Sequence, residues 1–387
     1  MTRLALVTWT AREPSGGNTF NRELVDALRA GGADVTIRAV PGEWPTAAPA
    51  DRAVLAAELA AARARDETVL VDAIVACGAP AEVGAAVAAG TTVAVLLHML
   101  PSDVAGLAVA ERQRRAAAEA AALRAASVVI CPSSAAAEDL VRRYGVRAHV
   151  AAPGTRPVPP AAGTRPPAPP AVGTRPPAPP ELMALANLVP GKDQVTLVRA
   201  LAQVRDLAWT ARLVGATGVD PAYTAVVRGE IAAAGLTDRV TLTGAKVGAA
   251  LEAEWARTDL LVLSSRSETF GLVVLEALAH GVPAVVPAGT GAVEALASGS
   301  VGAGGLSGRA PDGAVPPGRA VATDPAEPPG RAVPPGDPDA LAATFREWLT
   351  SPPLRDAWAA AARERRGRLP GWDVTAAQVL AALAQPM

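Results

Sequence analysis

The chain of 387 residues is long enough for two domains, each with a hydrophobic core of its own. Its 36 Lys and Arg residues nearly balance its 37 Asp and Glu residues, so no global field attracts nucleic acid or an anionic membrane. Cys77 and Cys131 are the two cysteines, and each ends an apolar run, which indicates buried reduced thiols rather than a disulfide framework.

The apolar run at residues 4–9 is too short for the core of a signal peptide. No apolar stretch approaches the ~20 residues that a membrane-spanning helix needs. We therefore expect a cytoplasmic protein.

In the first 152 residues, short apolar runs alternate with alanine-rich segments of helical spacing or composition. The predicted strands are residues 3–9, 34–40, 68–76, 91–98, 126–131 and 146–152. The predicted helices include residues 19–29, 111–125 and 135–143. This alternation predicts an N-terminal α/β domain, residues 1–152, built on a doubly wound parallel sheet.

A Pro-rich segment, residues 153–180, follows this domain and repeats Gly-Thr-Arg-Pro three times, from Gly154, Gly163 and Gly173. Proline at this density predicts a polyproline-like, semi-rigid linker that extends by about 3.1 Å per residue. Alternatively, the Pro-rich segment could be a ligand for an aromatic groove, but the composition of the segment favours a linker.

The alternation starts again after the linker and predicts a second doubly wound domain, residues 181–368. Its predicted strands lie near residues 182–188, 209–214, 239–243, 259–263 and 284–287. A Gly/Pro-rich stretch, residues 299–338, is expected to be a loosely ordered insertion in this domain.

Two glutamates with seven residues between them, Glu268 and Glu276, lie where a strand, a polar loop and a helix follow one another. Thr269 is expected to cap the helix, which should end before Gly281. Ligands bind at such a junction because helix-start amides and the helix dipole face an incoming anion. Glu268 could accept hydrogen bonds from sugar hydroxyls, and Glu276, about two turns into the helix, could meet a ribose diol.

Spacing alone also fits two structural glutamates, one near a helix start and one on a solvated face. The whole phrase from Ser267 to Val286, however, resembles the E-x7-E signature of the retaining glycosyltransferases of family 4. That resemblance implies the GT-B fold, in which two Rossmann-like domains face a central cleft. It further implies transfer of a sugar from a nucleoside diphosphate sugar, with retention of the anomeric configuration and with no separate cofactor.

Other residues of the second domain match the same family. Lys192 follows a predicted strand, and the resemblance implies that its ammonium neutralises the donor diphosphate. At Asn187 the family usually has an arginine, so this chain departs from the pattern there. Gly244, in the phrase Leu242 to Lys246, resembles the loop that frames the nucleotide base. By itself, each of these positions also fits an ordinary loop residue.

In the first domain, the paired glycines Gly16 and Gly17 follow the first strand and precede the predicted helix. Glycines let a backbone approach a ligand closely, although a plain turn would also need them. They resemble the family's N-terminal glycine loop, which meets the donor phosphate and the acceptor. His98 ends a predicted strand where the family often has a histidine that faces the donor sugar; a structural imidazole is the alternative.

We therefore predict three catalytic residues: His98, Lys192 and Glu268. The predicted donor-binding residues are Gly16, Gly17, Asn187, Gly244, Thr269, Phe270, Gly271, Leu272 and Glu276. No metal site is suggested, because no Asp-x-Asp cluster lies near them. Residues 369–387 resemble the C-terminal helix that crosses back onto the first domain in this fold.

Other functions remain open: a GT-B sugar phosphorylase, a nucleotide-sugar epimerase, or a nucleotide-sugar binding protein without turnover. Peripheral membrane contact is a further alternative, because the first domain carries Arg112, Arg114, Arg115, Arg124, Arg142, Arg143 and Arg147. Acidic residues interleave with these arginines, which favours a solvated helix face instead. We expect a nucleotide-sugar donor and an unidentified acceptor as partners, and no nucleic acid.

Overall fold

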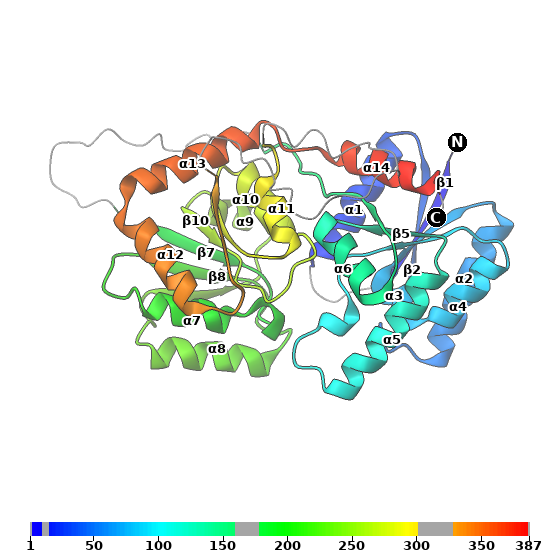
Figure 1. The fold of residues 1–387 in the computed structure, drawn as a ribbon, viewed down its shortest axis with the longest axis horizontal. Helices are drawn as coiled ribbons and strands as arrows, with labels where there is room; N and C mark the ends of the chain where they lie inside the picture. The colour runs from blue at the N-terminus through cyan, green and yellow to red at the C-terminus, as the bar shows by residue number, and fades with distance from the viewer. Residues whose placement is uncertain (1, 10–14, 159–177, 301–327, 386–387) are drawn as a thin grey trace. The chain divides into compact units, whose positions relative to one another are not determined.

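The computed structural model describes residues 2–9, 15–158, 178–300 and 328–385 and divides into two compact units (Figure 1). Unit 1 comprises Met1–Gly154, Ser267–Gly271 and Pro370–Met387. Unit 2 comprises Thr155–Arg266 and Leu272–Leu369. Most of the predicted linker (159–177) and of the predicted insertion (301–327) lies outside the described residues.

Unit 1 contains a parallel sheet of six strands in the order β2-β1-β3-β4-β5-β6. The strands are β1 (Arg3–Trp9), β2 (Asp34–Val40), β3 (Thr68–Asp72), β4 (Val93–Leu96), β5 (Val128–Cys131) and β6 (His149–Val150). Every residue of β4 and β5 is buried, as expected for parallel strands that are covered on both faces.

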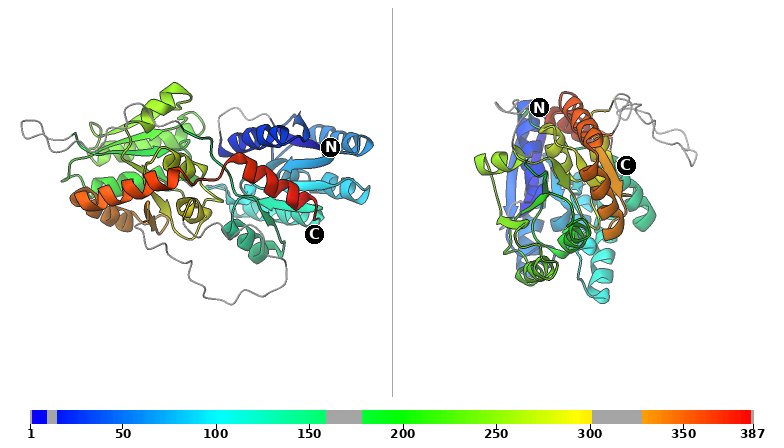
Figure 2. Two further views of the ribbon diagram at one scale, coloured as in Figure 1. Left: turned by 90° about the horizontal axis from the view of Figure 1, so that it is seen from above. Right: turned by 90° about the vertical axis from the view of Figure 1, so that its left-hand side faces the viewer.

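The sheet of unit 1 is covered by helices (Figures 1 and 2). They are α1 (Gly16–Ala30), α2 (Pro49–Ala64), α3 (Ala73–Gly78), α4 (Pro80–Ala88), the 3-10 turn η1 (Pro101–Asp103), α5 (Val109–Ala125), α6 (Ser134–Tyr144) and α14 (Trp372–Leu383). The C-terminal helix α14 packs on α1, where the ring of Trp372 meets the ring of Phe20 edge to face at 5.2 Å. Cys77 and Cys131 are both buried thiols, as expected.

Several elements of unit 1 differ from their predicted bounds; the sixth strand, for example, is His149–Val150 instead of residues 146–152, and a capping residue explains two of the other differences. The first helix begins at Gly16 instead of residue 19, because Ser15 Oγ accepts a hydrogen bond from the backbone N–H of Asn18 at 3.2 Å. The third strand ends at Asp72 instead of residue 76, because Asp72 Oδ1 accepts from the N–H of Ile74 at 3.0 Å. That cap starts α3, a helix that the apolar sequence after Asp72 had concealed.

Unit 2 contains a second parallel sheet of six strands, in the order β12-β11-β10-β7-β8-β9. The strands are β7 (Glu181–Leu185), β8 (Thr210–Val214), β9 (Val240–Gly244), β10 (Leu260–Val262), β11 (Ala284–Pro287) and β12 (Gly330–Val333). The covering elements are η2 (Pro190–Lys192), α7 (Gln194–Ala202), α8 (Pro221–Ala233), α9 (Ala249–Trp255), α10 (Leu272–Ala279), α11 (Gly291–Ala297), α12 (Pro338–Thr350) and α13 (Pro352–Arg366).

Strand β12 corrects the prediction that a loosely ordered insertion reaches residue 338. It pairs in parallel with β11 at the edge of the sheet, where flanking prolines remove no ladder hydrogen bond. Gly330 has a φ of +146°, and a Cβ there would lie 1.7 Å from the carbonyl oxygen of Ala284. The strand therefore depends on a glycine that composition alone assigns to a loop.

In each sheet the strand order reverses once, and at that point the connections leave toward opposite sides. The reversal lies between β1 and β3 in unit 1 and between β7 and β10 in unit 2. Ligands of open α/β sheets bind outside the carboxyl ends of strands at such a switch point. The residues after β1, β3, β7 and β10 are therefore the first place to look for a site.

Candidate functional site

His98 follows β4 in unit 1, and the residues around it hold its ring. The ring centroid lies 4.9 Å from that of Phe20, and a Cβ on Gly17 would lie only 3.2 Å from His98 Cδ2. His98 Nε2 lies 2.7 Å from Asn21 Oδ1. Burial lowers the pKa of His98, and the negative charge of Asp72 partly offsets this effect. The imidazole is therefore neutral near pH 7.

Asn21 and Asp72 complete this group, and sequence analysis missed both. Asn21 Nδ2 donates to Asp72 Oδ2 at 3.1 Å, while the other oxygen of Asp72 accepts from the N–H of Ile74. Asn21 and Asp72 are both buried. The available signal was the position of Asp72 at the carboxyl end of a strand that takes part in the switch point.

The glycine pair has a different setting from the predicted one. Gly16 and Gly17 are the first two residues of α1 instead of a loop before it. Gly16 is exposed, whereas Gly17 is half-buried beside His98. Gly17 is therefore required for space next to the imidazole ring, because its φ does not lie in the left-handed region.

The segment Ser267–Gly271, which carries Glu268, belongs to unit 1, whereas the residues on either side of it belong to unit 2. Thr269 anchors this segment: its Oγ1 donates to the carbonyl oxygen of His98 at 2.5 Å. Its own carbonyl accepts from Ser133 Oγ at 2.6 Å. Ser133 is fully buried, and its Oγ also accepts from the N–H of Ala136, which caps α6. The structure thus brings the segment of Glu268 to the backbone of His98.

These bonds overturn the expectation that Thr269 caps the following helix. Helix α10 begins only at Leu272, and the hydroxyl of Thr269 is already used on His98. Phe270 is buried, and Gly271 has a φ of +86°, a left-handed conformation that favours glycine. Glu268 is half-buried.

Lys192 lies in unit 2, at the end of the 3-10 turn η2 that follows β7. Its carbonyl accepts from Ser264 Oγ at 2.8 Å, and the N–H of Arg266 donates to the carbonyl of Gly191 at 2.9 Å. The Arg266 guanidinium pairs with Asp193, which caps α7. The loops after β7 and β10, the two strands at the switch point, are thereby fastened to each other.

Asn187 has a structural task in this region. Its Oδ1 accepts from the N–H of Ala216 at 3.1 Å, and its carbonyl accepts from Gln194 Nε2 at 3.1 Å. The side chain thus joins the ends of β7 and β8. An arginine side chain could not accept the bond from Ala216, so the departure from the family pattern has a local physical reason.

Gly244 ends β9 with a φ of +74°, and its carbonyl accepts from the N–H of Gly215 at 3.1 Å. A left-handed residue here turns the chain out of the sheet toward the segment 245–248. The position favours glycine for backbone reasons, whatever the loop binds.

Glu276 lies in the second turn of α10 and is half-buried. Burial, with the charge of Glu252 as a smaller cause, raises the pKa of Glu276 to about 7. Glu252 belongs to α9 and lies 3.1 Å from His280 Nε2, while His280 Nδ1 lies 2.7 Å from the backbone oxygen of Glu276. The His280 ring stacks on Trp255 with centroids 4.9 Å apart. These contacts fix the end of α10.

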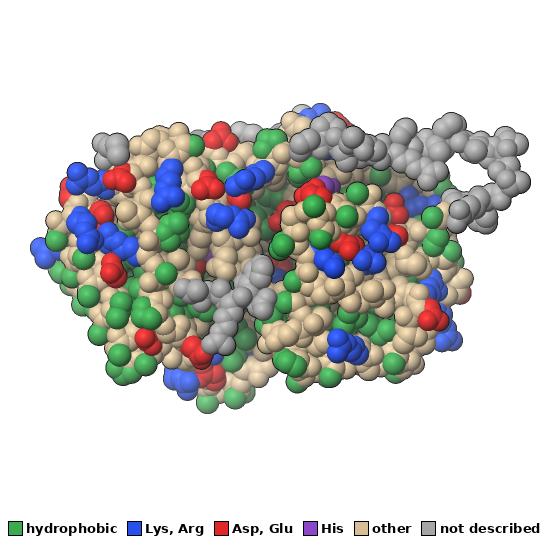
Figure 3. All heavy atoms as spheres, turned by 180° about the vertical axis from the view of Figure 1, so that it is seen from behind, with side chains coloured by type: hydrophobic (Ala, Val, Ile, Leu, Met, Phe, Trp, Pro, Cys, Tyr) green, Lys and Arg blue, Asp and Glu red, His purple; other side chains and the backbone are tan. Residues whose placement is uncertain are grey.

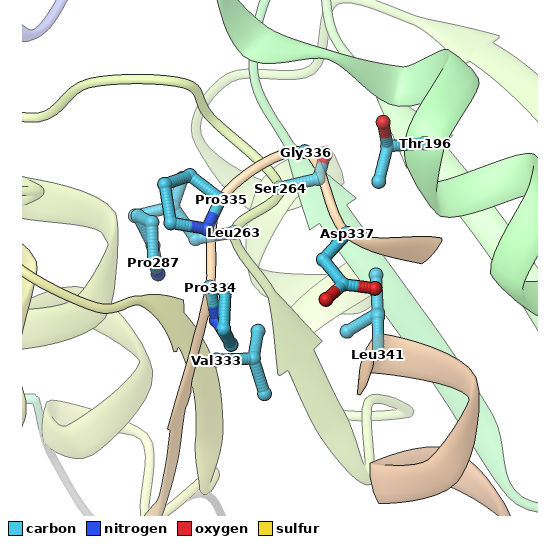
Figure 4. Close-up of a pocket in the computed structure, with 10 residues that line it drawn as sticks. All are labelled: Thr196, Leu263, Ser264, Pro287, Val333, Pro334, Pro335, Gly336, Asp337 and Leu341. Carbon is cyan, nitrogen blue, oxygen red and sulfur yellow. The ribbon is translucent and has the colours of Figure 1, made fainter. Parts of the chain in front are cut away.

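A small cavity lies at the carboxyl ends of β10, β11 and β12 in unit 2 (Figure 4). Ser264, Pro287, Pro335, Gly336 and Asp337 are among the residues that line it. Its volume of about 10 Å³ suits about one water molecule. Ligand pockets measure roughly 300–1,000 Å³, so this cavity is no nucleotide site.

The arginines of α5 and α6 are largely neutralised by their neighbours. Arg143 lies 2.8 Å from Asp103, and Arg115 lies 2.6 Å from Glu111. On the face shown in Figure 3, Lys and Arg side chains are interspersed with Asp and Glu.

Within the described ranges, no helix has the length and apolar character needed to cross a bilayer.

Comparison with known proteins finds a family that part of the chain resembles. Residues 170–306 match the family described as glycosyl transferases group 1. This match covers less than half of the chain. The matched region contains Asn187, Lys192, Gly244 and both motif glutamates. Membership in family 4 stays a prediction.

The chain is similar to the GDP-mannose-dependent alpha-(1-6)-phosphatidylinositol monomannoside mannosyltransferase of Mycobacterium tuberculosis, at 32% identity over 177 residues, 44% of this chain and 43% of the relative. The D-inositol 3-phosphate glycosyltransferase of Xylanimonas cellulosilytica is 36% identical over 165 residues, 39% of this chain and 38% of that one. The chain thus spans less than half the length of these curated relatives.

Among solved structures, the chain is similar to sucrose-phosphate synthase from Thermosynechococcus elongatus, with a TM-score of 0.74 at 22% identity over 100% of this chain and 99% of that chain. Anabaena HepE, solved with UDP and glucose, gives a TM-score of 0.70 at 19% identity over 99% of each chain. The fold of this chain is GT-B, as predicted.

Proposed function

We propose that the chain is a retaining glycosyltransferase that moves a sugar from a nucleoside diphosphate sugar to an acceptor of unidentified structure. One observation carries the proposal: Thr269 of the motif segment donates to the backbone of His98 at 2.5 Å. The segment of Glu268 is therefore fastened beside His98, the histidine that the same family resemblance predicts to face the donor sugar.

Each unit contributes its own groups to the proposed reaction. In unit 1, His98 and Glu268 hold the transferred sugar, and the amides near Gly17 and Gly271 face its phosphate. In unit 2, Lys192 neutralises the diphosphate and Glu276 accepts hydrogen bonds from the ribose diol. As the glycosidic bond breaks, the leaving diphosphate gains charge, and each preorganised donor commonly contributes about 3 kcal/mol to stabilising it.

The neutral side chain of Asn187 bears on the alternative of a binding protein without turnover. Because Asn187 brings no charge, Lys192 carries more of the diphosphate neutralisation in our proposal. Several neighbouring backbone amides can share this task, since helix starts attract anions without a charged side chain. Turnover is therefore retained in the proposal. The nucleotide base stays open, because one similar protein is named for GDP-mannose and another was solved with UDP.

A thermal-shift screen with UDP-, GDP- and ADP-sugars tests the donor. A ligand that binds only the folded state stabilises it by about 2.7 kcal/mol at a hundredfold excess over its dissociation constant. The matching donor should then release nucleoside diphosphate slowly in water and faster with a suitable acceptor. A protein stabilised by no nucleotide sugar would contradict the proposal. Product that appears without release of the diphosphate would instead favour an epimerase, and dependence on inorganic phosphate a phosphorylase.

A further inference from the structure

The group Asp72, Asn21 and His98 forms a hydrogen-bonded chain that ends at one nitrogen of the imidazole. We propose that Asn21 and Asp72 are positioning residues that keep the proton of neutral His98 on Nε2, so that Nδ1 remains a hydrogen-bond acceptor. Resting on the proposed function, the inference adds the partner of Nδ1: a hydroxyl of the transferred sugar.

The series of hydrogen bonds begins at Asp72, whose two carboxylate oxygens both accept hydrogen bonds. Oδ1 accepts from the backbone N–H of Ile74 at 3.0 Å, and Oδ2 accepts from Asn21 at 3.1 Å. The backbone amide fixes the carboxyl group at the start of α3. Only an N–H group of Asn21 can serve as the donor to Oδ2, so Asp72 decides which end of the Asn21 amide faces it.

That choice leaves Asn21 Oδ1 facing His98, 2.7 Å from Nε2. An amide oxygen only accepts hydrogen bonds, so Nε2 must carry the proton. A neutral imidazole has one N–H, and Nδ1 therefore keeps its lone pair. The interior of unit 1 disfavours a second proton, because burial lowers the pKa of His98.

Nδ1 is available to a ligand as far as the described residues go. No hydrogen bond of the described part of the chain uses it, and it is not one of the buried polar atoms without a partner. The His98 side chain is 10% exposed. Phe20 and Gly17 pack against the ring, and a half-turn of the ring would place Cε1 instead of Nε2 against Asn21 Oδ1 and lose that hydrogen bond.

The chain contains three histidines, so nitrogen-15 NMR of the imidazoles can test the tautomer directly in the ligand-free protein. A His98→Gln variant identifies the signals of His98. We expect the parent protein to show neutral His98 with the proton on Nε2 throughout the neutral pH range. A proton on Nδ1, or a doubly protonated ring, in the parent protein would overturn the proposal without any variant.

Variants of Asn21 extend the test to turnover. Asn21→Leu removes both bonds at nearly constant volume, and we expect mixed tautomers and a roughly tenfold to hundredfold fall in kcat. Asn21→Asp keeps an oxygen that accepts from Nε2 and adds a negative charge beside the ring. His98 should therefore become protonated near neutral pH, and the pH profile of kcat should shift. An unchanged tautomer in Asn21→Leu, or an unchanged pH profile in Asn21→Asp, would contradict the positioning role.

Thr375→Val is the matched control within unit 1. It removes a buried hydroxyl that donates to the carbonyl of Ala152 at 2.8 Å, and it leaves the His98 tautomer and kcat unchanged in our expectation. If the tautomer changes in Asn21→Leu while kcat and donor KM equal those of the parent, the assignment of Nδ1 to the sugar is wrong. In that case the donor screen still decides the proposed function separately.

Discussion

At the scale of single residues, Glu276 combines two properties that oppose each other. Its pKa of about 7 reflects the cost of an ionised carboxylate at a half-buried position near Glu252. In the proposed function the same carboxylate accepts two hydrogen bonds from a ribose diol. Function would then require the ionised form that the empty protein disfavours, which is common where binding groups are buried.

We expect Glu276→Gln to weaken donor binding about tenfold to a hundredfold, because one of two charge-assisted hydrogen bonds is lost. The ribose is remote from the bond that breaks, so the loss should appear mainly in the donor KM. Calorimetry with the matching nucleotide sugar measures it. Glu268→Gln is the contrasting variant: it should depress kcat, since its contacts tighten as charge develops. Parent-like binding and turnover in both variants would make the pair structural glutamates.

The pH dependence of stability should also change in Glu276→Gln. The folded-state pKa of about 7 lies above the ordinary value of 4.5, so the folded state binds the proton more tightly. Its stabilising contribution is complete below pH 4.5 and is lost as the pH rises through 7, by at most ~2–3 kcal/mol. Denaturant unfolding of parent and variant from pH 4.5 to 8 should give a difference that grows in favour of the variant. A constant difference would contradict the raised pKa.

At the scale of elements, the start of α1 lies against the ring of His98. Gly17→Ala should improve helix propensity by up to about 1 kcal/mol, yet its Cβ would meet His98 Cδ2 at 3.2 Å. The new methyl group would push the imidazole away from its hydrogen-bond partner Asn21. We therefore expect kcat to fall roughly tenfold or more. Gly229→Ala in α8 is the matched control, since nothing lies within 4 Å of its Cβ position. Equal kcat in the two variants would show that the ring tolerates displacement.

The segment Ser267–Gly271 is the second element whose placement can be tested. Thr269→Val keeps the shape of the side chain but removes the donor to the His98 carbonyl, while Thr269→Ser keeps the donor. Loss of such a bond costs about 1–3 kcal/mol when the acceptor is left unpaired. We expect Thr269→Val to lower kcat about tenfold and Thr269→Ser to retain most of it. Steady-state kinetics with the matching donor would refute the anchoring role if the two variants behaved alike.

At the scale of the whole molecule, the proposed chemistry requires no divalent metal. Lys192 and the backbone amides at helix starts are assigned to the diphosphate charge, which a metal ion neutralises in other transferases. We therefore expect the rate of diphosphate release to be unchanged by EDTA. Activity that vanished with chelator and returned with manganese or magnesium would refute this assignment of charges.

Much of the fold could be predicted from the sequence because the information is local. Apolar runs of strand length set the strands of both sheets except β12, and capping residues set several helix starts. Errors occurred where a local signal was ambiguous: the apolar residues after Asp72 continue as α3, and the Gly/Pro composition around Gly330 conceals an edge strand. In both cases a single contact, a cap or a close backbone approach, decides the structure.

By itself, the sequence determined the two-unit α/β organisation and the spacing of Glu268 and Glu276. Tertiary structure alone decided that Thr269 holds the carbonyl of His98, 171 residues away, and that Asn21 joins Asp72 to the imidazole. Hydrophobic periodicity specifies which residues are buried, but it contains no information about which buried polar groups meet. Those pairs depend on which strand ends and loops the fold brings together, and therefore on strand order, which periodicity does not record.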